Sequence, residues 1–273
     1  MYKVGLSSGG FPLTEENFRL MEQSNIAAIE IAMATELYKL IDYKQLAELS
    51  QRYNVKLWSY HLPYYPARII DVSSLNDEVQ KSTLSVYTEM IQKATEVGVD
   101  KFVVHPSGEP IADDERELKL QRSMQTLDEL AQIAKRYGAV IAVEDLPRSC
   151  LGNTADEMLR ILSANDALRV CLDTNHLLQE TNVEFMEKLG DKIVTVHISD
   201  YDFVDEQHWL PGEGLVNWNE LYIMFQKIGY QGVWLYELPL KSTNPERIRD
   251  LTFADFVENA NAIFNGNPLR RIY

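Results

Sequence analysis

Short runs of apolar, mostly β-branched residues recur along the chain, and an amphipathic stretch follows each of them. Runs such as 102–104, 140–143 and 193–196 are almost continuously apolar, which is typical of parallel strands covered by helices. The pattern predicts strands at residues 2–6, 26–31, 55–60, 101–105, 139–144, 168–172, 192–198 and 233–237.

The stretches between these strands carry the start and stop signals of helices. Thr14 stands where an N-cap is expected, and Thr154 with Glu157 has the spacing of a capping box. Three glycines each follow a helical stretch and precede a strand, as C-terminal caps do: Gly98, Gly138 and Gly229. No linker rich in proline, glycine or serine interrupts the chain, so residues 1–273 are predicted to form one domain.

Strands alternating with helices in this number fit either a closed barrel or a doubly wound open sheet. No Gly-x-Gly-x-x-Gly turn follows the first strand, where residues 7–10 read Ser-Ser-Gly-Gly, so a dinucleotide cofactor is not expected. The length also suits a barrel, which takes about 250 residues. The predicted fold is therefore α/β, a single (β/α)8 TIM barrel.

Charge and composition narrow the function. Apolar residues make up 45% and charged residues 25%, an ordinary globular balance. The net charge of −15 disfavours nucleic acid and anionic membranes as partners. Cys150 and Cys171 are too few for a disulfide framework, and neither a secretory signal nor a membrane-length apolar run is present. A cytoplasmic protein is expected.

Titratable residues stand at the carboxyl ends of the predicted strands: His61, His105, Glu144, Asp173 with His176, His197, and Glu237. In a barrel these ends converge on one rim, where barrel enzymes keep their chemistry. Glu144 and Glu237 end almost wholly apolar strands, and a buried carboxylate is costly unless it is paired or binds a metal. Oxygen and imidazole ligands suit a divalent ion such as Mn²⁺, Zn²⁺, Co²⁺ or Mg²⁺, and the identity of the ion is left open.

Five segments carry a family resemblance: Val-Glu-Asp at 143–145, Leu-Asp-Thr-Asn-His at 172–176, Val-His-Ile-Ser-Asp at 196–200, the segment 208–218 around Pro-Gly-Glu-Gly, and Tyr-Glu-Leu at 236–238. They resemble the xylose-isomerase-like TIM barrels, and within that superfamily the sugar (phosphate) isomerase/epimerase branch. The resemblance implies that one metal ion is bound by Glu144, Asp173, His197 and Glu237.

The resemblance also implies the activity, which is isomerisation or epimerisation of a small sugar, ketose or polyol. The ion polarises a carbonyl, and Glu144 and Glu237 remove and return a proton on the neighbouring carbon through an enediolate. Substrate contacts are expected from His176, His61, His105, Arg148, Glu213 and Trp209. Because the sequence has no glycine-rich phosphate cradle, an unphosphorylated substrate is favoured.

Other functions fit part of the pattern. Apurinic-site endonucleases of the same superfamily hold three metals, and their ligand set resembles His61, His105, Glu144, Asp173, His176, His197, His208 and Glu237. The segment Asp205–His208 departs from their Asp-x-His pair, however, and its acidic surroundings disfavour DNA. A keto-inositol-type dehydratase or a non-catalytic sugar-binding barrel uses the same rim. The tail, residues 269–273, is a candidate contact in a homo-oligomer.

Overall fold

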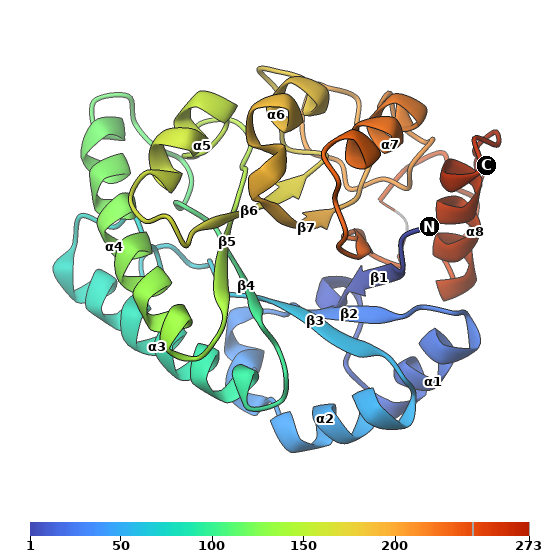
Figure 1. Ribbon diagram of the computed structural model, residues 1–273, viewed down its shortest axis with the longest axis horizontal. Coiled ribbons are helices and arrows are strands. Elements are labelled where there is room, and N and C mark those ends of the chain that lie inside the picture. Colours follow the sequence, from blue (N-terminus) through green and yellow to red (C-terminus); the bar gives the residue numbers. More distant parts are fainter. Residues whose placement is uncertain (242, 273) are drawn as a thin grey trace.

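The computed structural model describes residues 1–241 and 243–272, and eight parallel strands form its centre (Figure 1). The strands are β1 (Val4–Ser7), β2 (Ala28–Ile31), β3 (Lys56–His61), β4 (Lys101–Val104), β5 (Val140–Glu144), β6 (Arg169–Asp173), β7 (Ile193–His197) and β8 (Trp234–Tyr236). Each lies within its predicted run or extends one residue beyond it, so all the predicted strands are confirmed.

The sheet closes into a barrel. Strands that are consecutive in sequence pair side by side from β1 to β7, and β1 also pairs with β8. The β7–β8 seam is short: the Ile198 amide donates to the Leu235 carbonyl at 2.8 Å, and the Glu237 amide donates to the Ile198 carbonyl at 3.2 Å. The (β/α)8 barrel is confirmed, and the seam holds the ends of β7 and β8 together at the rim.

Helices surround the strands in a ring (Figure 1). They are α1 (Glu15–Gln23), α2 (Tyr43–Arg52), α3 (Asp77–Thr95), α4 (Arg116–Arg136), α5 (Ala155–Leu162), α6 (Asn182–Leu189), α7 (Trp218–Lys227) and α8 (Phe253–Phe264). Short 3₁₀ turns add η1 (Ser8–Gly10), η2 (Thr35–Leu40) and η3 (Gly190–Lys192). Among the described residues, no helix is long and apolar enough to cross a membrane.

The predicted helix ends are mostly confirmed. Thr14 caps α1 by accepting the Asn17 amide at 3.3 Å. The three C-terminal glycines have the positive φ that other residues rarely adopt: Gly98 at +91°, Gly138 at +72° and Gly229 at +70°. Thr154 caps α5, but its predicted capping box is wrong in one half. Glu157 instead accepts from the Gly152 amide at 2.7 Å and from Arg116.

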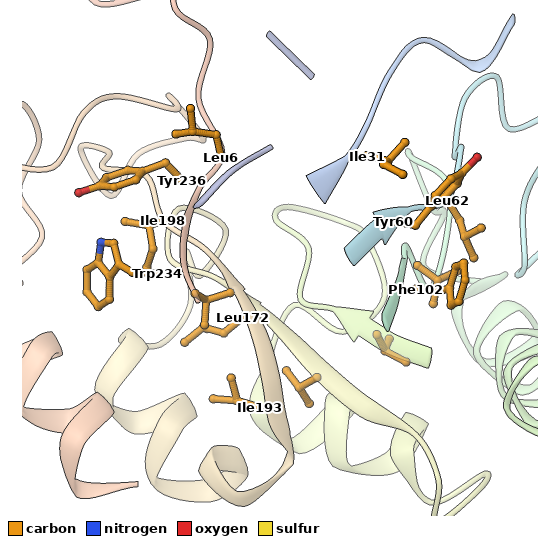
Figure 2. Packing of buried hydrophobic residues seen from close by; sticks show 14 of the residues in the cluster. Leu6, Ile31, Tyr60, Leu62, Phe102, Leu172, Ile193, Ile198, Trp234 and Tyr236 are labelled. Carbon is orange, nitrogen blue, oxygen red and sulfur yellow. The ribbon is translucent and has the colours of Figure 1, made fainter. Parts of the chain in front are cut away.

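Side chains along each strand point alternately toward the surrounding helices and toward the barrel axis. The side chains of Tyr60, Phe102 and Trp234 belong to the large cluster that packs the strands against the helices (Figure 2). Along β5, Ile141 belongs to this cluster, whereas Ala142 packs in a separate small cluster with residues of β4 and β6. Glu144, two residues on, shares the face of Ala142. The barrel axis therefore receives the polar side chains at the carboxyl ends.

The C-terminal tail folds back on the chain. The Ile272 carbonyl accepts the Ile248 amide at 3.0 Å, and the Ile272 side chain is buried. The predicted oligomer contact over 269–273 includes residue 273, which lies outside the described residues, and it stays a prediction.

Candidate active site

Four side chains that the sequence analysis grouped together converge at the rim. Glu144, Asp173 and His197 end β5, β6 and β7, and Glu237 directly follows β8. Each offers one nitrogen or oxygen atom, and these atoms all lie within 4.8 Å of one another. The chain thus brings three carboxylates and one imidazole to one point, although they are far apart in sequence.

The His197 ring is at the centre of this group. Its Nδ1 atom lies 2.8 Å from Glu144 Oε1, 3.0 Å from Glu237 Oε2 and 3.9 Å from Asp173 Oδ2. Asp173 Oδ2 is buried and has no hydrogen-bond partner. A buried carboxylate oxygen without a donor is costly, and a cation would remove that cost. The residues therefore fit a divalent ion with oxygen and imidazole ligands.

The pKa values in the group show how strongly these charges interact. Burial raises the pKa of Asp173 to about 6. Burial also disfavours ionised Glu144 and Glu237, but the facing His197 outweighs it, lowering the pKa of Glu237 to about 2 and that of Glu144 well below its usual range. Burial favours the neutral form of His197, yet the surrounding acidic groups, Cys171 and carboxylates, raise its pKa well above 6.5. A proton on His197 thus stabilises the group when no cation is present.

This proton gives a pH prediction. Because His197 must be deprotonated to bind a cation, loading Zn²⁺ or Mn²⁺ at pH 7 is expected to release about one proton per ion. Since the pKa of His197 is raised, apparent metal affinity should increase by about tenfold per pH unit until that pKa is passed. Titration calorimetry in two buffers of different ionisation enthalpy measures the release. Equal heats in both buffers would contradict the prediction.

Two histidines flank Glu144 on its other side. His61 Nε2 and His105 Nε2 each lie 3.1 Å from Glu144 Oε2, and the three residues form a second group with metal-ligand geometry. Burial favours neutral His61, but its hydrogen bond to Glu144 raises its pKa to about 9. Burial lowers the pKa of His105. The Tyr64 ring stacks on His105 with centroids 3.9 Å apart.

A third group forms where the β6 and β7 loops meet. His176 Nε2 lies 3.2 Å from Glu206 Oε2, and His208 Nε2 lies 4.0 Å from the same oxygen. His176 Nδ1 donates to the Asp145 carbonyl at 2.8 Å, which fixes the ring. Asp205 stands three residues before His208 and so departs from the Asp-x-His pair of the three-metal endonucleases. Glu206 has the right spacing from His208, and the Glu-x-His pair was the signal that could have revealed it.

A cavity of about 620 Å³ opens above the four-residue group. Glu144 and Glu237 reach its lining, whereas Asp173 and His197 are fully buried beneath. Most of the predicted substrate-binding residues also line it: His61, His105, His176 and Arg148. The pocket therefore has the two predicted catalytic carboxylates at its floor.

Arg148 reaches the pocket but is already paired with acidic side chains. Its guanidinium donates to both oxygens of Glu109 at 2.6 and 2.7 Å, to Asp205 at 2.6 Å and to Glu206 at 2.9 Å. Its backbone has a φ of +52°, and Asn153 donates to its carbonyl at 2.7 Å. Arg148 thus ties the loops after β4, β5 and β7 together across the mouth.

The structure does not bring Glu213 or Trp209 to the pocket. Neither belongs to the described residues that line it. The Glu213 side chain is fully buried against Arg247. The Nε and Nη2 atoms of Arg247 donate hydrogen bonds to the Glu213 carboxylate at 3.0 and 2.5 Å. Trp209 is half-buried, and its backbone pairs with Asp200 beside β7. Both residues thus lie apart from the described residues that line the pocket, and their substrate contacts stay predictions.

Glu30 of β2 was missed by the sequence analysis. It is fully buried and lies beneath the four-residue group, with its oxygens 3.0 and 3.2 Å from His197 Nε2. Its signal was a lone carboxylate in the otherwise apolar run 28–31.

Comparison with known proteins identifies the family. A family model described as a xylose isomerase-like TIM barrel matches residues 18–252. The chain belongs to the xylose isomerase-like TIM barrel family. Over 239 residues this barrel is 24% identical to an inosose isomerase of Bacillus velezensis, covering 82% of each chain.

Solved structures share the fold of this chain. The xylose isomerase-like barrel superposes on a D-tagatose 3-epimerase-like protein with a TM-score of 0.81 and 28% identity, covering 96% of this chain and 97% of the other. It superposes on the IolI protein, solved with a bound zinc atom, with a TM-score of 0.76 and 21% identity, covering 97% of both chains.

Proposed function

We propose that this barrel is a metal-dependent isomerase or epimerase of a small, uncharged sugar, ketose or polyol. The observation that carries the proposal is the convergence of Glu144 and Glu237, at the floor of an open pocket, with Asp173 and His197 directly beneath them. The relatives named as sugar epimerases and inosose isomerase support the same class of reaction.

We assign proton transfer to the two carboxylates of the four-residue group that reach the pocket. A divalent ion, when bound by the four residues, polarises a substrate carbonyl and stabilises the negative charge that forms next to it. Glu144 and Glu237 come from different sides of the barrel, β5 and the end of β8, and both reach the pocket. We assign to one the removal of the proton on the neighbouring carbon and to the other its return.

Return of the proton decides the product. If the second carboxylate delivers it to the opposite face of the same carbon, the product is an epimer. If the proton is delivered to the adjacent carbon, the product is an aldose–ketose isomer. His61 and His176 also line the pocket, and we assign to them contacts with substrate oxygens.

The charges at the mouth favour an uncharged substrate. Among the described residues that line the pocket, Arg148 is the only lysine or arginine. Its guanidinium already donates four hydrogen bonds to carboxylates. Glu109 and Glu206 add negative charge at the same place. A phosphorylated sugar would meet these carboxylates, and no unpaired lysine or arginine stands among the described residues of the pocket. Recognition of hydroxyl groups therefore fits the pocket better.

Solvent exchange tests the proposal. The metal-loaded protein is incubated in deuterated water with a panel of ketoses and keto-inositols, with and without a phosphate group. Deuterium is expected at a carbon next to the carbonyl of an unphosphorylated substrate, and chelation of the metal should stop its entry. No exchange across a broad panel would overturn the proposal. Loss of water from the product would instead indicate a dehydratase.

A second function is favoured by one specific observation. The groups around His61 and His176 flank the central group, and the first of them shares Glu144 with it. Several metals at one rim suit phosphodiester cleavage, because they stabilise both the attacking and the leaving oxygen. The net charge of −15 and the paired Arg148 oppose DNA binding. Cleavage of an abasic-site duplex by the metal-loaded protein would support this second function.

A further inference from the structure

We infer that Glu30 is a positioning residue that orients the metal ligand His197 and selects its tautomer. The inference rests on the proposed metal-dependent function, because it assigns a role toward the same ion. Glu30 is completely buried in the middle of the barrel, where no bulk water reaches it. Its carboxylate therefore interacts with the side chains described below rather than with solvent.

The contacts of Glu30 are with His197 and Ser59. Oε1 and Oε2 lie 3.0 and 3.2 Å from His197 Nε2, and Ser59 donates its hydroxyl to Oε2 at 2.7 Å. Glu30 and Ser59 are partners in the β2–β3 register, so the sheet fixes their distance. The carboxylate is thus held on one side by β3 and on the other by the ring of His197.

This arrangement determines which nitrogen of His197 faces the ion. An ionised carboxylate only accepts hydrogen bonds, so the Nε2 atom of His197 must carry hydrogen and donate. In the neutral ring, the lone pair then lies on Nδ1, which faces Glu144, Glu237 and Asp173. A carboxylate behind a ligating imidazole fixes ring orientation and raises the basicity of the ligand.

The local sequence explains why this carboxylate points to the axis. In β2, Ile29 and Ile31 belong to the cluster packed against the helices, so the residue between them faces the barrel interior. If Glu30 only supported the fold, a neutral side chain with the same hydrogen bonds to Ser59 and His197 could replace it. If Glu30 makes His197 a stronger metal ligand, its negative charge is needed.

The test is Glu30→Gln, which keeps the size and the acceptor oxygen but removes the charge. Binding of Co²⁺ and Zn²⁺ is measured by calorimetry, and the visible spectrum of bound Co²⁺ reports its ligand field. Metal affinity is expected to fall by about 10–100-fold, with a shifted Co²⁺ spectrum. Ser59→Ala, which removes one hydrogen bond to Glu30, should cause a smaller loss in the same direction.

Asp255→Asn is the matched control. Asp255, in the first turn of α8, is also a largely buried carboxylate, but it pairs with Arg249. It should lower stability and leave metal affinity and the Co²⁺ spectrum unchanged. Wild-type affinity and spectrum in Glu30→Gln, or an equal loss of affinity in Asp255→Asn, would overturn the inference.

The outcomes also separate this inference from the proposed function. If the wild-type protein binds no Co²⁺ stoichiometrically, both are overturned. If metal binding depends on Glu30 as expected but no sugar exchanges its proton, the positioning role stands and only the proposed reaction fails.

Discussion

Glu144→Gln is expected to lower deuterium exchange into the substrate by about 10²–10⁴-fold, the range that general acid–base catalysis contributes. The amide has the same shape but cannot accept a proton. Its oxygen can still face His197, and Asp173 and Glu237 remain as ligands, so part of the metal affinity should persist. Exchange is measured by proton NMR at a metal concentration that saturates the variant, which separates loss of the base from loss of the ion.

Glu109→Gln provides the comparison within the same pocket. Glu109 lines the pocket and binds Arg148, but it does not belong to the groups with metal-ligand geometry. Its substitution removes the same unit of charge and should reduce exchange far less than Glu144→Gln. Unchanged exchange in Glu144→Gln, with the ion bound, would show that Glu144 is not the base.

Arg247→Met is expected to destabilise the fold by about 3–5 kcal/mol, as loss of one partner of a buried ion pair does. The side chains of Arg247 and Glu213 are both completely inaccessible to solvent. Removing the guanidinium leaves the Glu213 carboxylate buried without its cation between the loops after β7 and β8. Urea unfolding of the metal-free protein, followed by circular dichroism, measures the change in the free energy of unfolding.

The double substitution Arg247→Met with Glu213→Gln separates the ion pair from packing. Because it removes both charges, it should recover a large part of the lost stability. A loss below about 1 kcal/mol in Arg247→Met, the size expected for an exposed pair, would contradict this description of the β7 and β8 loops.

The strands and the central group could be predicted because a parallel barrel leaves simple traces in sequence. Each strand is buried on both faces, so it appears as an apolar run, and a charged residue at its end is conspicuous. Glu144 and Asp173 were found in this way. Glu30 was not, because it lies inside the short run 28–31 rather than at its end, and the alternation that turns it to the axis was overlooked.

The loops could not be predicted as well, because their contacts join residues far apart in sequence. Glu213 lies in segment 208–218, one of the segments that carry the family resemblance. Its partner, however, is Arg247, 34 residues later. Arg148 was expected to meet substrate, yet its partners Glu109 and Asp205 come from two other loops. Nothing in the local sequence of either residue indicates which charge it meets.

The position of the ion tests the central claim most directly. Crystals of the zinc-loaded protein, measured at the zinc absorption edge, give an anomalous map that locates the metal without any assumption about activity. We predict a strong peak about 2.0–2.2 Å from one atom of each of Glu144, Asp173, His197 and Glu237. A map without a peak at that point, or with density only between His176 and His208, would contradict it.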